Sequence, residues 1–549
     1  MARRTIGRKK LTPEVKARLA ELAAEARELL YGEAGCPAWG TTFAEIEEDA
    51  KEVGHEFIRE MMEQTAQEQA ASLPEEAWES ETGEPVQRVG VRKRTLETES
   101  GPVVWQEPQG DLPKSRKAFF PQSRAMGLPV DETLSPSLLR KTVHLGTALV
   151  SFPSARESLA EALEVELTTK RVERRTEEVG QSRIAEREAA IREWEDLPLL
   201  EKLQPPRGVK PPEVVSVECD GGRMQRCDLP EEAKSSWCET KVGILLELDS
   251  EERETDPCPE LPEVFEDVAA MGELTREVHR LASEKTSVPK GEVFESSGEE
   301  LEDEPSRRSA VWEEASEVGS RTYSPPRVVS REVTATLGPA DQLGRQLAML
   351  AWQWGFVTAT RKAFVSDGGG WNWSIWEKQF KHLRFVPILD FIHALTYVYS
   401  AALAGRSREA GAGVYRRWIR WVWQGQVAKV IVEVAARAEE LGAPPEDAGE
   451  TDPRRIVQRT LTYLVNQQSR MNYPEYRRLG LPITSSHMES TVKPINQRVK
   501  GSEKFWSREG GEALLQLRAD QLSDSDPLAL YWLRRFRTAT GTRSYTRTA

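Results

Sequence analysis

The stretch PPEVVSVECDGGRMQ, residues 211–225, carries the pattern that decides the fold. Its β-branched residues predict a strand, and the Asp-Gly-Gly that follows predicts that this strand ends in a turn at Asp220. A carboxylate at a strand end beside a glycine turn is held firmly by the sheet and stays open to a ligand. Asp220 is therefore a candidate site residue.

Strand and helix patterns continue toward the carboxyl terminus. Strands are expected at 239–249 and within 324–338, and a helix at 340–356. The strand RKAFVSD ends at Asp367 before three glycines, a helix follows at 372–383, and the buried run RFVPILD ends at Asp390. The order of three strands, helix, strand, helix, strand predicts an α/β class with a mixed sheet flanked by helices.

With 549 residues, the chain is long enough for two to four structural units. We expect the following divisions: a helical and partly disordered region at 1–134, with 71–135 rich in loop; a helical DNA-binding domain at 135–205; a catalytic core at 206–400 with an acidic surface insertion at about 250–322; an all-helical insertion at 401–480; the end of the core at 481–537, returning to the strand layer at 481–489; and a flexible terminus at 538–549.

Charge is segregated along the chain. The formal net charge is −14, but counting Lys and Arg against Asp and Glu gives about −15 for residues 241–320 and about +10 for residues 341–549. A basic carboxyl-terminal portion can bind phosphate despite the acidic total. No apolar run reaches the roughly 18 residues of a membrane helix, and the basic start MARRTIGRKK lacks the apolar core of a secretory signal, so we expect a cytoplasmic protein without a membrane partner.

Two regions carry candidate DNA-binding cations. The helices around the break at EVELTT (164–169) suit a helix-turn-helix, in which Thr168 or Thr169 caps the second helix; an exposed, charged helix face explains the same pattern equally well. In the helical insertion, Trp418, Trp421 and Val422 share a face that favours core packing, while the arginines beside them can meet phosphate. The candidates are Lys170, Arg171, Arg174 and Arg175 in the first region and Arg416, Arg417 and Arg420 in the second.

Three carboxylates form the candidate catalytic group. If the strands that end at Asp220 and Asp367 are neighbours, these two carboxylates converge, and Glu489 from a later helix would complete an oxygen-rich site for Mg²⁺ or Mn²⁺. Such a site activates a water or a 3′-hydroxyl against a phosphodiester. Each acid has a simpler explanation: an Asp-Gly pair is usually a turn, and Ser486 with Glu489 has the spacing of a capping box.

The segment NQQSRMNYPEYRRLGLPITSSHMESTVKPINQRVKGSEKFW (466–506), together with CDGG (219–222) and SDGGGWNW (366–373), resembles the Kra family of bacterial insertion-sequence transposases of the DDE group. The resemblance covers about residues 135–537. It implies a ribonuclease H-like core interrupted by the helical insertion, with Asp220, Asp367 and Glu489 as the metal-binding catalytic triad.

The same resemblance implies further roles. Asp390 and His393 match an Asp-x-x-His pair with an accessory role in orienting DNA or the metal site; in the alternative, His393 caps or packs at the start of the insertion helix. The basic tail Arg498, Lys500 and Lys504 is expected to contact DNA. Pro494 lies inside the helix that should present Glu489, and we expect it to kink that helix.

The expected function is divalent-metal-dependent cleavage and strand transfer at the ends of an insertion sequence. The implied partners are double-stranded DNA, both terminal inverted repeats and target, and further copies of the chain as a dimer or larger oligomer, in the bacterial nucleoid. A catalytically degenerate or domesticated transposase that only binds DNA is the first alternative. A structural or regulatory interaction protein is the second.

Overall fold

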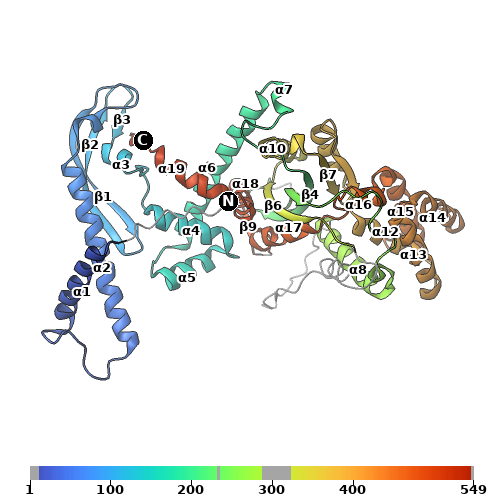
Figure 1. The fold of residues 1–549 in the computed structure, drawn as a ribbon, viewed down its shortest axis with the longest axis horizontal. Helices are drawn as coiled ribbons and strands as arrows, with labels where there is room; N and C mark the ends of the chain where they lie inside the picture. The colour runs from blue at the N-terminus through green and yellow to red at the C-terminus, as the bar shows by residue number, and fades with distance from the viewer. Residues whose placement is uncertain (1–10, 231–234, 287–322, 502, 546–549) are drawn as a thin grey trace. The chain divides into compact units, whose positions relative to one another are not determined.

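The computed structural model describes residues 11–230, 235–286, 323–501 and 503–545 (Figure 1). The chain divides into two compact units: unit 1 is Met1–Thr176 with Pro527–Ala549, and unit 2 is Glu177–Asp526. The division falls inside helix α6 (Thr169–Glu195), whereas the sequence analysis places a division between residues 205 and 206. One uninterrupted helix carries the chain from one unit into the other, and the sequence has no break there.

Unit 1 combines helices with a small antiparallel sheet in the order β1-β2-β3-β10. Its elements are α1 (Pro13–Tyr31), α2 (Phe43–Ala71), η1 (Glu75–Trp78), β1 (Gln87–Thr98), β2 (Gly101–Leu112), β3 (Lys117–Phe119), α3 (Pro121–Ala125), α4 (Pro136–Ala148), α5 (Phe152–Leu163), the start of α6, α19 (Pro527–Arg537) and β10 (Thr542–Ser544). The prediction that residues 71–135 are largely loop is wrong, because β1 and β2 form a long hairpin.

The inner face of this hairpin explains its stability. Leu96, Val103 and Trp105 are buried against Ala66 of α2 and Leu128. β1 has buried polar side chains, Arg94 and Thr98, and exposed apolar ones, Val89 and Val91, which gives the segment a composition typical of loops. Its alternation of buried and exposed positions is therefore not matched by an alternation of apolar and polar residues.

The carboxyl terminus also belongs to this sheet. β10 pairs with β3 in antiparallel register, and the N–H of Phe120 donates to the carbonyl of Gly541 at 2.7 Å. The predicted flexible terminus at 538–549 is therefore wrong for residues 542–544, since backbone pairing fixes them. Residues 546–549 lie outside the described part.

Unit 2 is built on one mixed sheet in the order β6-β5-β4-β7-β8, and β9 pairs with β4 off this path (Figure 1). The strands are β4 (Val214–Arg226), β5 (Trp237–Asp249), β6 (Arg327–Thr336), β7 (Arg361–Ser366), β8 (Val386–Leu389) and β9 (Phe505–Trp506). β5 is antiparallel to β4 and β6, whereas β7 is parallel to β4 and β8. The strands predicted at 239–249, within 324–338, at 361–367 and at 384–390 are confirmed, and so is the strand before Asp220, although β4 continues beyond its predicted end at Asp220.

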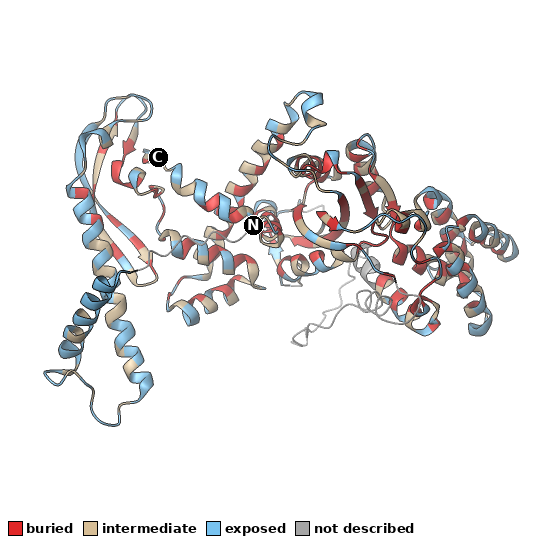
Figure 2. Cartoon of the chain, viewed as in Figure 1, coloured by how far each residue is buried: buried red, intermediate tan, exposed pale blue. Residues whose placement is uncertain are grey.

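Helices cover both faces of this sheet, and the strands are among its most buried parts (Figure 2). On one face, Leu347 of α10 (Ala340–Gln353) packs so closely on Gly243 that a Cβ there would lie 2.8 Å from it. On the other face, Asn496 of α17 (Ser486–Val499) meets Gly222, and Gly511 of α18 (Arg508–Leu522) meets Met224. Glycine at these positions lets the helices approach the sheet.

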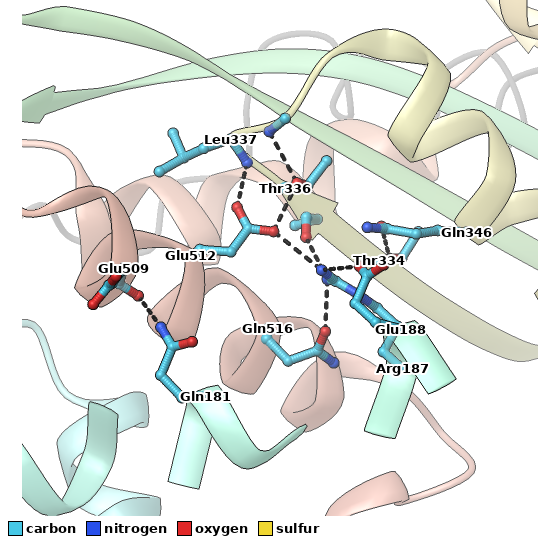
Figure 3. A network of polar contacts seen from close by, with 12 residues as sticks. Gln181, Arg187, Glu188, Thr334, Thr336, Leu337, Gln346, Glu509, Glu512 and Gln516 are labelled. Atoms are coloured by element: carbon cyan, nitrogen blue, oxygen red, sulfur yellow. Dashed lines mark hydrogen bonds and ion pairs between the residues drawn. The ribbon is translucent and has the colours of Figure 1, made fainter. Parts of the chain in front are cut away.

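A buried polar network fixes the edge strand β6 to α6 and α18 (Figure 3). Arg187 of α6 donates to Gln516 at 2.7 Å and pairs with Glu512 at 3.2 Å. Glu512 also accepts hydrogen bonds from the Thr336 hydroxyl at 2.7 Å and the Leu337 N–H at 2.6 Å. The charge of Arg187 is therefore paired and hydrogen-bonded inside the protein, as a buried charge requires.

The predicted all-helical insertion is confirmed, although its first helix starts at Phe391, directly after β8. Its helices are α12 (Phe391–Leu403), α13 (Arg408–Trp423), α14 (Val427–Leu441), α15 (Pro453–Gln467), η5 (Gln468–Arg470) and α16 (Tyr473–Arg478). Trp418 and Val422 are buried as predicted.

The acidic insertion is more than a surface loop over its described part. Residues 250–286 contain η2 (Glu263–Glu266) and α8 (Val268–Thr286). Phe265 is buried, its ring lies 5.2 Å from that of Phe391, and its carbonyl accepts a hydrogen bond from Tyr415 at 2.8 Å. Aromatic contacts therefore tie this acidic segment to the helical insertion; its remainder, 287–322, lies outside the described residues.

The remaining elements of unit 2 connect these layers: α7 (Leu199–Lys202), η3 (Phe356–Thr358), α11 (Gly370–Ile375) and the π-helical turn η4 (Trp376–Phe380). Residues 481–485 return to the end of β8, where the Phe391 N–H donates to the carbonyl of Ile483 at 2.9 Å, but they add no strand. In the described ranges, no helix has both the length and the apolar character needed to cross a membrane.

Candidate metal-binding active site

Asp220 and Asp367 lie beside one another at the carboxyl end of the parallel part of the sheet. In the β4–β7 ladder, Glu218 pairs with Val365. Continuing this register by two residues places Asp220 next to Asp367, at the usual spacing of about 5 Å between neighbouring strands. The condition that the sequence left open, that the two strands are neighbours, is confirmed.

The pKa of Cys219, which lies next to Asp220 in β4, depends on the nearness of Asp367. Burial, and then the negative charges of Glu218, Asp220 and Asp367, raise the pKa of this thiol well above its usual value. Asp367 is thus close enough to β4 for its charge to act on a β4 side chain, which agrees with the register.

Asp220 does not end its strand, contrary to the prediction. β4 continues to Arg226, and β5 pairs with it throughout, with Val242 opposite Asp220. The glycines after Asp220 serve close packing instead of a turn: a Cβ on Gly222 would lie 2.8 Å from Asn496 of α17 and 2.7 Å from Thr240. Side chains alternate along a strand, so Asp220 and Gly222 face the same way, toward the layer of α17.

Asp367 lies in the turn between β7 and α11, where neutral donors hold one of its oxygens. Oδ1 accepts hydrogen bonds from the Gly369 N–H and the Asn372 side-chain amide, both at 2.9 Å, and from the Ser366 hydroxyl at 3.3 Å. The residue is half-buried. These bonds orient the carboxylate at the sheet edge without neutralising it.

Glu489 lies in the first turn of α17, on the helix that covers the Asp220 face of the sheet. It is seven residues before Asn496, so the two side chains share one face of the helix. The capping box expected at Ser486 and Glu489 is not formed: the N-cap is Ser485, and no side-chain cap hydrogen bond is made there. The capping explanation of Glu489 is therefore wrong. α17 also continues through Pro494 to Val499 as one helix.

Asp390, the predicted accessory residue, is fully buried at the position next to Asp367 in the parallel register. Its Oδ1 caps α12 by accepting the His393 N–H at 3.1 Å. Its Oδ2 accepts the Ser485 N–H at 2.6 Å and the Ser485 hydroxyl at 2.7 Å. Asp390 therefore anchors the segment that leads into α17, and it contributes to the site by positioning the helix of Glu489.

His393 is half-buried at the start of α12. Burial, then the positive charge of Arg459, then His393, lower the pKa of His279 in α8. His393 thus lies near α8, and its backbone N–H donates to Asp390 at the start of α12. This contact matches the alternative in which His393 packs at the start of the insertion helix.

In unit 1, the predicted helix-turn-helix candidates lie at the start of α6. Lys170 pairs with Glu173 at 2.8 Å, whereas Arg171 and Arg175 donate to the Thr133 hydroxyl at 3.0 and 3.1 Å. Arg174 is exposed. Thr168 caps this helix by accepting the Arg171 N–H at 3.2 Å, as predicted. Arg171 and Arg175 thus serve internal structure, and Lys170 and Arg174 are the more accessible cations.

In unit 2, a shallow hollow follows the exposed face of α13 and is lined by Gly413, Arg416, Arg417, Arg420, Trp421 and Gln424. Arg420 forms two hydrogen bonds to Glu266, at 2.6 and 2.7 Å, and Arg417 pairs with Glu433 at 2.5 Å. These carboxylates offset part of the positive charge that the sequence assigned to DNA binding.

The basic tail divides by burial. Arg498 is only 1% exposed and lies over the Trp506 ring at 5.1 Å, so its prediction as a DNA contact is wrong. The helical period turns it into the protein, where burial and then Arg518 lower its pKa to about 10. Lys500 and Lys504 are half-buried, and Lys504 donates to the carbonyl of Gln497 at 2.7 Å.

Over the described residues, no three or more His, Cys, Asp or Glu side chains are already arranged as a metal site. Sequence reasoning missed the supporting groups Asn372, Tyr463, Gln467 and Ser485, which contact Asp367, its turn or Asp390. Asn372 lies in the quoted SDGGGWNW segment and could have been found there. The others come from distant parts of the chain, and no local pattern marks them.

Comparison of the chain with protein-family models and with curated proteins finds no match.

Proposed function

We propose that unit 2 is the catalytic core of a DDE transposase, which cleaves DNA and joins strands at the ends of a mobile element with the help of divalent metal. The observation that carries the proposal is the parallel pairing of β4 with β7, in which Glu218 lies opposite Val365, two residues before Asp220 and Asp367 respectively. Two carboxylates that follow this register, Asp220 within β4 and Asp367 just after β7, can bind one hard cation between them.

The order of the strands supports a ribonuclease H-like core. Numbered along unit 2, the sheet reads 3-2-1-4-5, so the first and fourth strands are adjacent. These strands carry Asp220 and Asp367, and the third acid comes from α17 after the helical insertion. This is the order of acids that the sequence resemblance implies.

The donor set fits Mg²⁺ or Mn²⁺, because carboxylate oxygens are the ligands these ions prefer. A bound ion would polarise the scissile phosphate and activate the attacking water or 3′-hydroxyl. Asp220 and Asp367 would hold it at the sheet edge, and Glu489 would reach it from α17 by rotating its side chain. The donors on Oδ1 of Asp367 would keep that carboxylate aimed while the ion exchanges.

DNA would be held by exposed and half-buried cations outside the acidic centre, in contacts that position the backbone without reading sequence. In unit 2, Arg416 is exposed in the hollow on α13, and Lys500 and Lys504 follow the helix of Glu489. In unit 1, Lys170 and Arg174 are exposed on α6.

The test uses the full-length chain and duplex oligonucleotides that tile the DNA flanking its coding region. We expect nicking and joining that require Mg²⁺ or Mn²⁺ and are lost in Asp220→Asn, Asp367→Asn and Glu489→Gln, while gel-shift binding persists in all three. Cleavage that survives in every variant would reject the assignment. Binding without any cleavage by the wild type would favour the degenerate, DNA-binding alternative.

A further inference from the structure

Helix α15 of the insertion contacts the Asp367 turn through two side chains. The hydroxyl of Tyr463 donates to the carbonyl oxygen of Asp367 at 2.9 Å. The side-chain amide of Gln467 donates to the carbonyl oxygen of Gly368 at 3.3 Å. The two residues are four positions apart, so they project from the same face of the helix and grip consecutive peptide groups of the turn.

The turn packs closely against the Tyr463 ring at Gly368. Gly368 has a φ of +99°, a conformation that favours glycine. A Cβ on Gly368 would lie 2.9 Å from Cε2 of Tyr463 and 3.3 Å from Cδ1 of Leu389. The absence of a side chain at position 368 is therefore what lets the insertion helix reach the backbone of Asp367.

Tyr463 is itself held in place by α12. Its ring stacks on that of Tyr397, with centroids 3.8 Å apart and planes within 7°. The Thr460 hydroxyl, one turn earlier in α15, donates to the carbonyl of Tyr397 at 3.3 Å. α12 in turn starts from Asp390 at the end of β8. A continuous chain of contacts thus leads from the sheet through α12 and α15 back to the turn.

We propose that Tyr463 and Gln467 are positioning residues through which the helical insertion sets the place of the Asp367 carboxylate. The inference rests on the proposed function of Asp367 as a metal ligand. Gly369 and Asn372 fix the side chain of Asp367 from within the turn, whereas Tyr463 and Gln467 fix its main chain from outside. Both restraints are needed, because a carboxylate follows any shift of its own backbone.

The substitution Tyr463→Phe removes the hydroxyl and keeps the ring that stacks on Tyr397. Tyr399→Phe is the matched control: Tyr399 lies in α12, and its hydroxyl donates to the carbonyl of Val268 at 3.2 Å, away from the turn. Both variants lose one hydrogen bond from a tyrosine of the insertion to a backbone carbonyl outside it. Only the first loses it at Asp367.

The measurement is binding of Mn²⁺ alone to the full-length chain, followed by the electron paramagnetic resonance signal of the free ion. We expect Tyr463→Phe to raise the Mn²⁺ Kd about three- to tenfold, the effect of losing one hydrogen bond. Tyr399→Phe should match the wild type. In DNA cleavage, Tyr463→Phe should need correspondingly more Mn²⁺ for half-maximal rate and recover to within about twofold at saturating Mn²⁺.

Gly368→Ala offers a second, independent variant, because the added methyl group pushes the turn away from Tyr463 without changing the hydroxyl. It should also raise the Mn²⁺ Kd. Wild-type affinity in both Tyr463→Phe and Gly368→Ala would overturn the inference, as would equal weakening by Tyr399→Phe.

The Asp367→Asn variant distinguishes a failure of the positioning role of Tyr463 and Gln467 from a failure of the proposed metal site. If Asp367→Asn weakens Mn²⁺ binding and the turn variants do not, the inference fails and the proposed function stands. If Asp367→Asn binds Mn²⁺ like the wild type, the proposed function fails and the inference fails with it.

Discussion

The ends of β7 and β8 carry two aspartates at equal register on neighbouring parallel strands, and the protein uses them differently. Asp390, after β8, is fully buried, and both of its oxygens accept bonds from the segments that start α12 and precede α17. Asp367, after β7, is half-buried, and its Oδ1 accepts hydrogen bonds from Ser366, Gly369 and Asn372.

This contrast shows how the same sequence feature, a strand followed by an aspartate, acquires two roles. Burial makes Asp390 a structural anchor, because its donors would be left without an acceptor if it were removed. Partial exposure makes Asp367 available to a cation. Spacing along the chain does not distinguish the two; the surrounding donors do.

The largest expected effect is on DNA cleavage, when Asp367, the more exposed aspartate, is substituted. Asp367→Asn should lower metal-dependent DNA cleavage by at least about 10³-fold, because it removes a charge that holds the metal against the phosphate. The urea midpoint of unfolding should move by less than the equivalent of about 1 kcal/mol, since Asn keeps the oxygen that accepts from Gly369. A large loss of stability would erase the distinction from Asp390.

Substitution of Asp390, the buried aspartate, should mainly lower stability. Asp390→Ala should cost about 3 kcal/mol or more in the free energy of unfolding, because it removes a helix cap and leaves the Ser485 and His393 N–H groups without their acceptor. Urea denaturation measures this loss. Asp390→Asn keeps part of the acceptor capacity and should cost less than Ala; a fully stable Ala variant would contradict the anchoring role.

A third carboxylate, that of Glu332, extends the comparison to the dependence of stability on pH. Glu332 in β6 is buried, and burial, only partly offset by bonds from Ser525, raises its pKa from 4.5 to about 7. A raised folded-state pKa contributes stability that is fully present below about pH 4.5 and is lost as pH rises through about 7. The loss should reach about 2 to 3 kcal/mol between these limits.

This contribution is read from urea midpoints measured across the pH range. Glu332→Gln should remove that part of the pH dependence, because the amide does not titrate. An unchanged slope in Glu332→Gln would assign the effect to another group.

The smallest expected effect is on DNA affinity and concerns the basic side chains. Like the two aspartates, these differ in how far they are buried. Burial and then the charge of Arg498 lower the pKa of Lys504 to about 8. If Lys504 contacts phosphate, DNA affinity should fall a few-fold between pH 7 and 9 as the ammonium loses its proton. Lys504→Arg should remove this dependence, since arginine stays charged. Fluorescence anisotropy with a labelled duplex at constant ionic strength measures both; a pH dependence shared by wild type and Lys504→Arg would exclude Lys504 as its source.

The sequence predicted the sheet of unit 2 well, because its strands are apolar runs bounded by Gly, Asp and Pro. It also placed Asp220 and Asp367 at the same end of the sheet. It failed for β1 and β2, where buried positions also carry polar residues such as Arg94 and Glu107, and for Gly222, whose lack of a side chain allows contact with Asn496 and does not form a turn. Such roles depend on tertiary packing.

The site could be predicted only in part for the same reason. Local spacing marks acids at strand ends, but it does not reveal that Asp390 is enclosed by Ser485, or that Tyr463 reaches the Asp367 carbonyl from almost one hundred residues away. For Arg498 the sequence pattern suggested a function that the structure does not support. Its place in the basic tail suggested a DNA contact, but its position on α17 turns the side chain into the protein, where it is buried.

The most direct measurement is anomalous diffraction from crystals grown with Mn²⁺. We predict a Mn²⁺ peak between the carboxylates of Asp220 and Asp367, within about 2.5 Å of an oxygen from each and lost in Asp367→Asn. Mn²⁺ bound only elsewhere, with these two carboxylates ordered and unliganded, would contradict the account.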